Sequence, residues 1–125
     1  MATDVSFAGT ITVTNPDTGL TNLEKSISAA FAGDINTLAE SISVTTSPST
    51  IGLPASPTQV VYIKNNSLSF EVTVTWTRNG GASASVAVLE PGAILLLVET
   101  NSTSGITALS LVATGTSAVE YFLAA

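Results

Sequence analysis

The chain has 125 residues, of which nine are acidic and three are basic, and it contains no histidine and no cysteine. Without histidine there is no Ser-His-Asp arrangement, and without cysteine there is no thiolate nucleophile, zinc-thiolate site or redox pair. The length fits one domain that buries its core without disulfides. We therefore expect no enzymatic activity, no cofactor and no metal site.

The sign of the charge argues against two classes of partner. The three basic residues are Lys25, Lys64 and Arg78, and the formal net charge of −6 repels phosphate backbones and anionic lipid headgroups. The first residues lack the basic segment and apolar run of a secretory signal, so we expect the chain to stay in the cytoplasm where it is made until it is assembled. The longest apolar run, Ala93 to Val98, is far shorter than the ~20 residues that cross a bilayer.

Low charge also predicts an unusual surface. The mean hydropathy is +0.49, and so few charges leave most of the surface neutral. Large apolar areas on a protein surface usually mark interfaces. The composition therefore favours a protein covered by copies of itself or by another subunit, with a neutral, threonine-rich monomer as the alternative.

The first predicted element is a strand over Val5 to Thr14. Val5, Phe7, Ile11 and Val13 alternate with small and hydroxylated residues, which is the pattern of a strand with one buried face. Residues 1–4 precede it, either as an arm that reaches a neighbour or as a frayed end.

Residues 21–45 allow two structures. Apolar residues from Leu23 to Ile42 recur every three or four positions, after a helix capping box at Thr21 to Glu24, which is typical of a helix. Gly33 in mid-run and the Ser/Thr/Ile alternation on either side of it favour two strands joined near Gly33 and Asp34. We favour strands.

The rest of the chain has the length, composition and turn punctuation of further strands. These cover Gln59 to Lys64, Phe70 to Arg78, Ala84 to Leu89, Ala93 to Glu99, Ile106 to Ala113 and Ala118 to Leu123. Within Phe70 to Arg78 the alternation assigns Trp76 to the core. The whole pattern predicts an all-β, single antiparallel β-sandwich domain over residues 1–125, jelly-roll-like, with about eight or nine short strands.

One predicted strand is apolar on both faces. The run Ile94 to Val98 fits either a central strand or a strand covered by another subunit. We expect it to form contacts between subunits together with the terminal strand. The predicted contact residues are Ile94, Leu95, Leu96, Leu97, Val98, Val119, Tyr121 and Leu123.

Carbohydrate or receptor binding is the alternative function from another class. Sugar-binding sandwiches use exposed aromatic rings, and here the pattern assigns Phe7, Phe70 and Trp76 to the packing face. Tyr62 and Tyr121 are the remaining candidates.

Several segments, taken in order, resemble the small β-sandwich virion structural proteins of tailed bacteriophages. They are Asn22 to Leu53, Val60 to Asn66, Leu89 to Leu96 and Val119 to Leu123. The resemblance implies a non-enzymatic decoration (cement) protein, a minor tail protein or a head-fibre protein of the virion. It also implies a homo-oligomer, expected to be a trimer, that binds the major capsid protein or another virion protein. It brings no catalytic residues.

Overall fold

The structure, a computed structural model, describes residues 2–14, 16–34, 37–53, 57–81, 83–99 and 103–124. These residues form ten strands and no helix, and all strand pairs are antiparallel. The prediction of an all-β antiparallel fold is confirmed, with ten strands in place of eight or nine.

In chain order the strands are Ala2–Thr14 (β1), Thr21–Asp34 (β2), Thr37–Val44 (β3), Ser49–Thr50 (β4), Val60–Asn65 (β5), Val72–Arg78 (β6), Ser85–Leu89 (β7), Ile94–Val98 (β8), Ile106–Ala113 (β9) and Ser117–Ala124 (β10). The predicted strands match these within three residues at each end. Strand β4 was not predicted because it has only two residues and adjoins the turn at Pro48.

Two strands occupy the ambiguous region, so the helical alternative is wrong. Strand β2 pairs with β1 along its whole length, from Ala2 opposite Asp34 to Thr14 opposite Thr21. The partner strand supplies the backbone hydrogen bonds that a helix would have supplied internally, and Gly33 weakens the helical option further. The connection between β2 and β3, at residues 35 and 36, lies outside the described residues.

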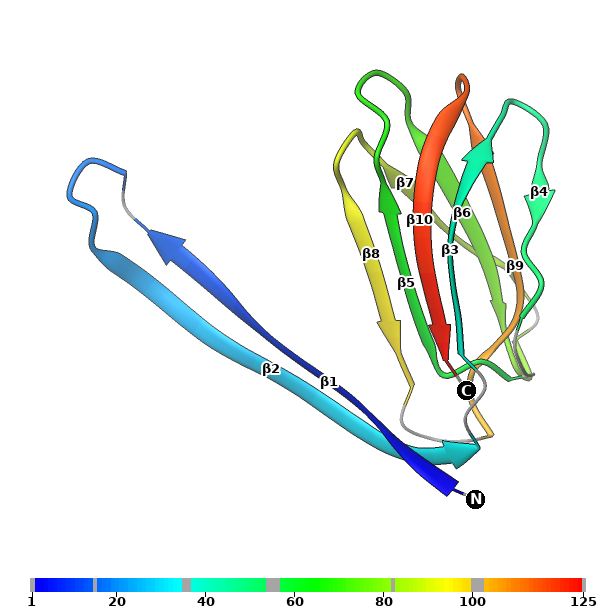
Figure 1. Cartoon of the computed structure of the whole chain (residues 1–125), viewed down its shortest axis with the longest axis horizontal. Coiled ribbons are helices and arrows are strands. Elements are labelled where there is room, and N and C mark those ends of the chain that lie inside the picture. Colours follow the sequence, from blue (N-terminus) through cyan, green and yellow to red (C-terminus); the bar gives the residue numbers. More distant parts are fainter. Residues whose placement is uncertain are drawn as a thin grey trace.

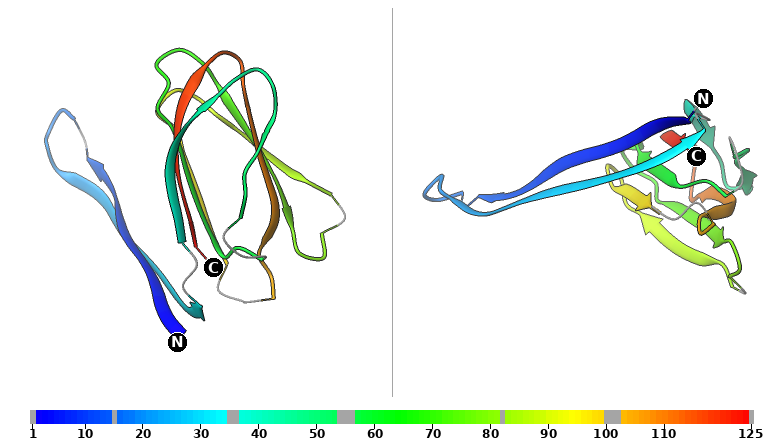
Figure 2. Two further views of the ribbon diagram at one scale, coloured as in Figure 1. Left: turned by 45° about the vertical axis from the view of Figure 1, so that its right-hand side comes forward. Right: turned by 90° about the horizontal axis from the view of Figure 1, so that it is seen from below.

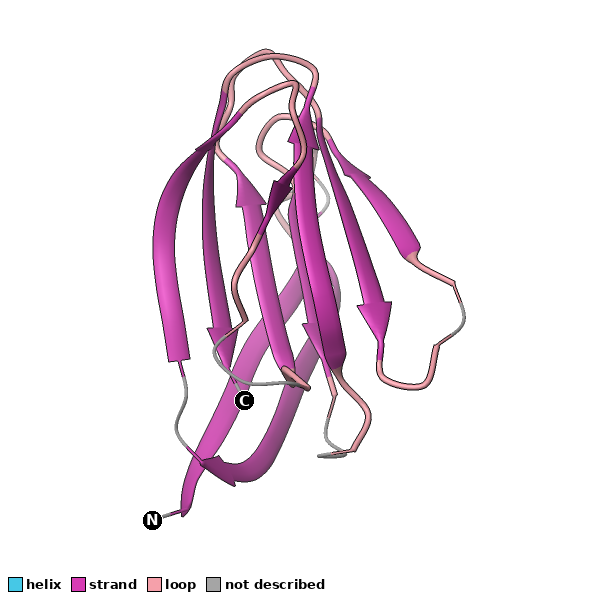
Figure 3. Cartoon of the chain, turned by 90° about the vertical axis from the view of Figure 1, so that its right-hand side faces the viewer, coloured by secondary structure: helices cyan, strands magenta, loops and turns pink. Residues whose placement is uncertain are grey.

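Strands β3 to β10 form two packed four-stranded sheets. Their strand orders are β3-β10-β5-β8 and β4-β9-β6-β7, and Figures 1 and 3 show the two sheets facing each other. Successive strands alternate between the sheets except for the hairpin β6-β7, and the first strands of the sandwich lie beside its last ones. This is the strand order of a double-sheet jelly roll, so the jelly-roll prediction is confirmed.

The core lies between the two sheets and is made by alternate residues of each strand. Its largest fully buried members are Ile63, Leu109, Leu111, Leu123, Val44, Val61, Val72, Val74 and Val119. Trp76 packs against this core and is partly buried. Its assignment to the apolar face is correct, although one part of the ring stays accessible.

A buried amide links the sheets. Asn65 is fully buried at the end of β5, and its Nδ2 donates hydrogen bonds to the carbonyl oxygens of Phe70 at 2.8 Å and Leu89 at 2.9 Å. Its Oδ1 accepts a hydrogen bond from the backbone N–H of Ser67 at 2.9 Å. Polar groups of this kind are stable in a core only when they are satisfied, and Asn65 is.

Strands β1 and β2 form a sheet of their own, the arm (residues 2–34). Figures 1 and 2 show the arm extending away from the sandwich, which it joins at the end where the C-terminus lies. The two sandwich sheets are therefore built from residues 37–124, not from the whole chain as we expected. Residues 2–4 belong to β1, so the arm is far longer than the four residues considered from the sequence.

Candidate functional site

Strand β8 is an edge strand. It pairs with β5 on one side, and no described strand pairs with its other side. The first explanation for its apolar character, a central position, is therefore wrong. Leu95 and Leu97 pack against the core, whereas Ile94 is 55% exposed. Covering of the exposed side by another subunit stays a prediction.

The predicted contact residues of β10 lie inside the molecule. Val119 and Leu123 are fully buried and Tyr121 is 6% exposed, because β10 runs between β3 and β5 and these residues point into the core. They therefore hold the sandwich together and present no exposed side chain. Only β8 can offer the expected contact at the surface.

The outer face of the β3-β10-β5-β8 sheet carries a second apolar cluster, the apolar band. Val60 and Ala124 are its buried members, and Leu96, Val98 and Phe122 pack against them while partly exposed. The register aligns Ala124 with Val60 and Val60 with Val98, and the next outward-facing row aligns Phe122, Tyr62 and Leu96. The apolar band thus spans three adjacent strands.

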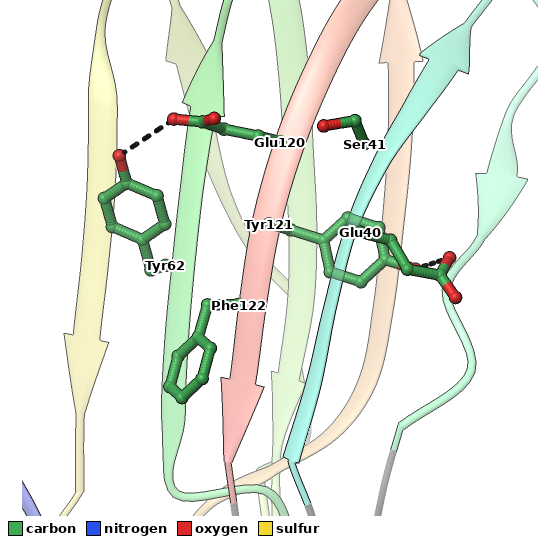
Figure 4. A pocket seen from close by; sticks show the side chains of 6 residues that line it. All are labelled: Glu40, Ser41, Tyr62, Glu120, Tyr121 and Phe122. Carbon is green, nitrogen blue, oxygen red and sulfur yellow. Dashed lines mark hydrogen bonds between the residues drawn. The ribbon is translucent and has the colours of Figure 1, made fainter.

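A shallow hollow of about 430 Å³ lies beside the apolar band, lined by Glu40, Ser41, Tyr62, Glu120, Tyr121 and Phe122. Figure 4 shows that each carboxylate accepts a hydrogen bond from a tyrosine. The Tyr62 hydroxyl donates to Glu120 Oε1 at 3.3 Å, and the Tyr121 hydroxyl donates to Glu40 Oε2 at 2.8 Å. Strands β3, β5 and β10 thus bring together residues that are 21 to 82 positions apart in the sequence.

Both tyrosines in this hollow stay neutral at ordinary pH. Burial, and then the hydrogen bond and charge of Glu40, raise the pKa of Tyr121 to about 12. Burial and the Glu120 carboxylate likewise raise the pKa of Tyr62 above its usual value. A neutral phenol is a hydrogen-bond donor and not a base or nucleophile, so the arrangement suits binding.

Of the two tyrosines that the sequence offers as sugar platforms, only one is accessible. Tyr62 is half-buried on the outer face, whereas Tyr121 belongs to the core. The described residues contain no group of three or more Cys, Asp or Glu side chains placed to hold a metal ion.

A second hollow, of about 340 Å³, brings a partly accessible tryptophan next to polar groups. Trp76 lines it together with Gln59, Arg78 and Glu99, and Arg78 Nη2 lies 2.6 Å from Glu99 Oε2. The sequence pattern did not find this site, because alternation assigns Trp76 to the apolar face and cannot show that the face is open at its end.

The outer face of the β4-β9-β6-β7 sheet is uncharged. The register aligns Thr75 with Val86 and Ser110, and Thr73 with Val88 and Val112. The described strand positions on this face, the neutral face, are Thr50, Thr73, Thr75, Thr77, Val86, Val88, Ala108, Ser110 and Val112. Val86 and Val88 are exposed large apolar side chains. A strand surface without charged side chains shares the depletion of charge that marks interface centres.

Comparison with protein-family models, with curated proteins and with solved structures finds no match to this chain. In the part of the chain that the structure describes, no helix has the length and hydropathy needed to span a membrane. Interpretation of the two hollows, the apolar band and the neutral face therefore depends on their geometry and chemistry.

Proposed function

We propose that the chain is a non-enzymatic virion structural protein, a decoration protein that binds the outer shell of a capsid as a homo-oligomer, with a trimer as the expected state. The observation that carries the proposal is the neutral face of the jelly roll. A protein that covers a shell needs broad area free of charge, since charged side chains are depleted at interface centres. Val86 and Val88 supply exposed apolar side chains there.

The remaining features support the same function. The net charge of −6 keeps the protein away from packaged nucleic acid. Two broad surfaces, the neutral face and the apolar band, lie on opposite sides of the sandwich. One can contact the shell while the other contacts a copy of the chain. We assign the neutral face to the shell.

Carbohydrate binding in the Trp76 hollow is a second candidate, favoured by the juxtaposition of an indole ring with Arg78, Glu99 and Gln59. Aromatic rings beside paired polar groups suit the alternating apolar and hydroxylated faces of sugars. This function is compatible with a head-fibre or tail location.

Electron microscopy of purified particles that carry the labelled protein tests the proposal. Regular labelling over the shell, in many copies, supports decoration. Labelling confined to the tail contradicts it and points to the minor-tail alternative. A glycan array that retains the wild-type protein but not Trp76→Phe would favour the carbohydrate-binding candidate.

Substitutions on the neutral face test the assignment of the shell contact. Thr75→Lys places a charge at the centre of the neutral face, and Ser43→Lys on β3 places the same charge on the opposite sheet, where Ser43 is exposed. We expect Thr75→Lys to lower particle occupancy at least tenfold and Ser43→Lys to leave it unchanged. Equal occupancy of both variants would contradict the assignment.

A further inference from the structure

We propose that the arm of one copy packs its apolar face on the apolar band of a second copy. This inference rests on the proposed function, because it explains how the expected homo-oligomer forms.

The register of the arm separates apolar from polar residues. Residues directly opposite each other in an antiparallel pair share one face. On one face the pairs are Val5 with Phe31, Phe7 with Ala29, Gly9 with Ile27, Ile11 with Lys25, and Val13 with Leu23. Lys25 is the only charged residue among these positions. The other face pairs small and hydroxylated residues with one another and carries three carboxylates, those of Asp4, Glu24 and Asp34.

The arm has no layer of its own to pack against. A two-stranded ribbon alone is marginal in water, and neither β1 nor β2 makes an extensive contact with a strand of the sandwich. Ile11 is 53% exposed, Val13 is 46% exposed, and Leu20 near the turn is 68% exposed. The apolar face of the arm therefore needs a cover from outside its own sandwich.

The accessible surface area of the chain indicates how much area such a cover would bury. A compact monomer of 12.6 kDa exposes about 6,200 Å², whereas this chain exposes 7174 Å². The surplus of about 1,000 Å² is close to the ~800 Å² that each partner buries in a stable interface of standard size. A second copy that receives the arm accounts for this surplus.

The apolar band lies where an exchanged arm can reach it. Strand β3 begins at Thr37, three residues after the arm ends, and Thr37 lies opposite Ala124, a buried member of the apolar band. The root of the arm and the apolar band therefore share one end of the sheet, and Figure 1 shows the end of β2 on the same side of the sandwich as the C-terminus. Copies arranged around a symmetry axis near this end can each give one arm and receive one, which closes the assembly.

The charges are complementary. Two carboxylates, Glu40 and Glu120, line the hollow beside the apolar band, and one ammonium, that of Lys64, lies opposite Glu120 on the same face, which leaves a net negative charge. The apolar face of the arm carries one charge, the ammonium of Lys25. An arm that lies on the apolar band can bring this ammonium to the carboxylates, so the match fixes the orientation of the arm as well as its location.

Cross-linking of the full-length chain tests the proposal. Because the chain has no native cysteine, only the introduced cysteines can react. A chain with Ile11→Cys is coexpressed with a tagged chain carrying Ile94→Cys, on the exposed outer side of β8, and treated with a short bis-maleimide. We expect a covalent heterodimer at least five times more abundant than in the control, where Thr12→Cys on the polar face of the arm replaces Ile11→Cys.

Two results would overturn the proposal: equal yields from Ile11→Cys and Thr12→Cys, or a chain with both Ile11→Cys and Ile94→Cys that links within itself at monomer mass. The second result would mean that the arm covers its own sandwich. Because the experiment needs no particles, a positive cross-link together with absence from the capsid would reject the decoration function and leave the arm exchange standing.

A charge swap tests the orientation of the arm. Lys25→Glu should lower the oligomer's association constant at least tenfold, and adding Glu120→Lys in the same chain should restore most of it. Glu90→Lys, which makes the same charge change at an exposed turn position away from the apolar band, is the control and should not restore the association of Lys25→Glu. A Lys25→Glu variant with wild-type association would overturn the proposed orientation.

Discussion

At the scale of single residues, the fold depends on a few buried polar and close-packed positions that composition does not reveal. The sequence shows Asn65 only as part of an Asn-Asn-Ser segment, whereas the structure gives its amide three hydrogen bonds, one of them to Leu89 on the opposite sheet. The sequence likewise shows Gly105 as a turn residue. In the structure, a Cβ at Gly105 would lie 2.6 Å from the carbonyl oxygen of Thr58.

Replacing Asn65 with leucine should lower the free energy of unfolding by about 3 kcal/mol, because it leaves the buried Leu89 carbonyl oxygen and the partly buried Phe70 carbonyl and Ser67 N–H groups without their hydrogen-bond partner. Chemical denaturation measures the change. The neighbouring Asn66→Ala, at an exposed position, should change the free energy by less than about 0.5 kcal/mol. Similar values for both variants would mean that Asn65 does not link the sheets.

Gly105→Ala should destabilise the fold by about 1–3 kcal/mol, because the new methyl group meets rigid backbone at the bridge between Thr58 and Ile106. Gly52→Ala is the matched control, since nothing lies within 4 Å of a Cβ there. Thermal unfolding of both variants compares them. An unchanged Tm for Gly105→Ala would contradict the close approach of the Gly105 backbone to the carbonyl oxygen of Thr58.

Tyr121 should make the protein less stable in strong alkali. Its folded-state pKa of about 12 lies above the ordinary pKa of tyrosine, about 10, so its stabilising effect is complete below pH 10 and is lost as the pH rises towards 12. In a Tyr62→Phe chain, Tyr121 is the only tyrosine, and its tyrosinate absorbance should appear near pH 12. A midpoint near pH 10 would show that burial and Glu40 do not protect the phenol.

At the scale of elements, β8 shows what alternation can and cannot predict. The run Ile94 to Val98 predicts a strand and suggests a covered surface, but five apolar residues in a row carry no period-two signal that distinguishes inner from outer positions. The register makes the distinction: Leu95 and Leu97 face the core, and Ile94 and Leu96 face outward. An edge strand of this composition is an aggregation hazard unless something covers it.

The two sides of β8 should therefore respond differently to substitution. Leu97→Ala should lower the free energy of unfolding by about 2 kcal/mol, because it leaves space at the core. Ile94→Asp should leave that free energy within about 0.5 kcal/mol of wild type but weaken self-association. Denaturation and sedimentation of both variants measure the two effects. Weaker self-association of Leu97→Ala, with wild-type self-association of Ile94→Asp, would contradict the assignment of Leu97 to the core and of Ile94 to the contact surface.

At the scale of the whole molecule, the sequence was sufficient for the fold class and for most strand positions. Alternation, turn residues and β-branched composition are local signals, and β9 at Ile106–Ala113 was predicted to the residue. The arm was not predicted, because Val5, Phe7, Ile11 and Val13 alternate in the same way whether a strand packs in a sandwich or in a separate ribbon. Alternation predicts that one face of a strand is covered, but it does not predict which segment or subunit covers that face.

The candidate site was predictable only in part for the same reason. The sequence identified β8 and Tyr62, but it also assigned Val119, Tyr121 and Leu123 to contacts, although their burial in the core follows from the central position of β10. The neutral face combines residues of four strands that are neighbours only in the folded sheet. Its threonines look in the sequence like ordinary solvent-facing positions.

The central claim is that the apolar band left exposed after folding is covered by another copy of the chain. Sedimentation equilibrium of the purified full-length protein tests it most directly. The account predicts a closed oligomer whose mass is a whole multiple of 12.6 kDa, with a trimer expected, that persists on dilution. A single species of 12.6 kDa at every concentration would contradict it.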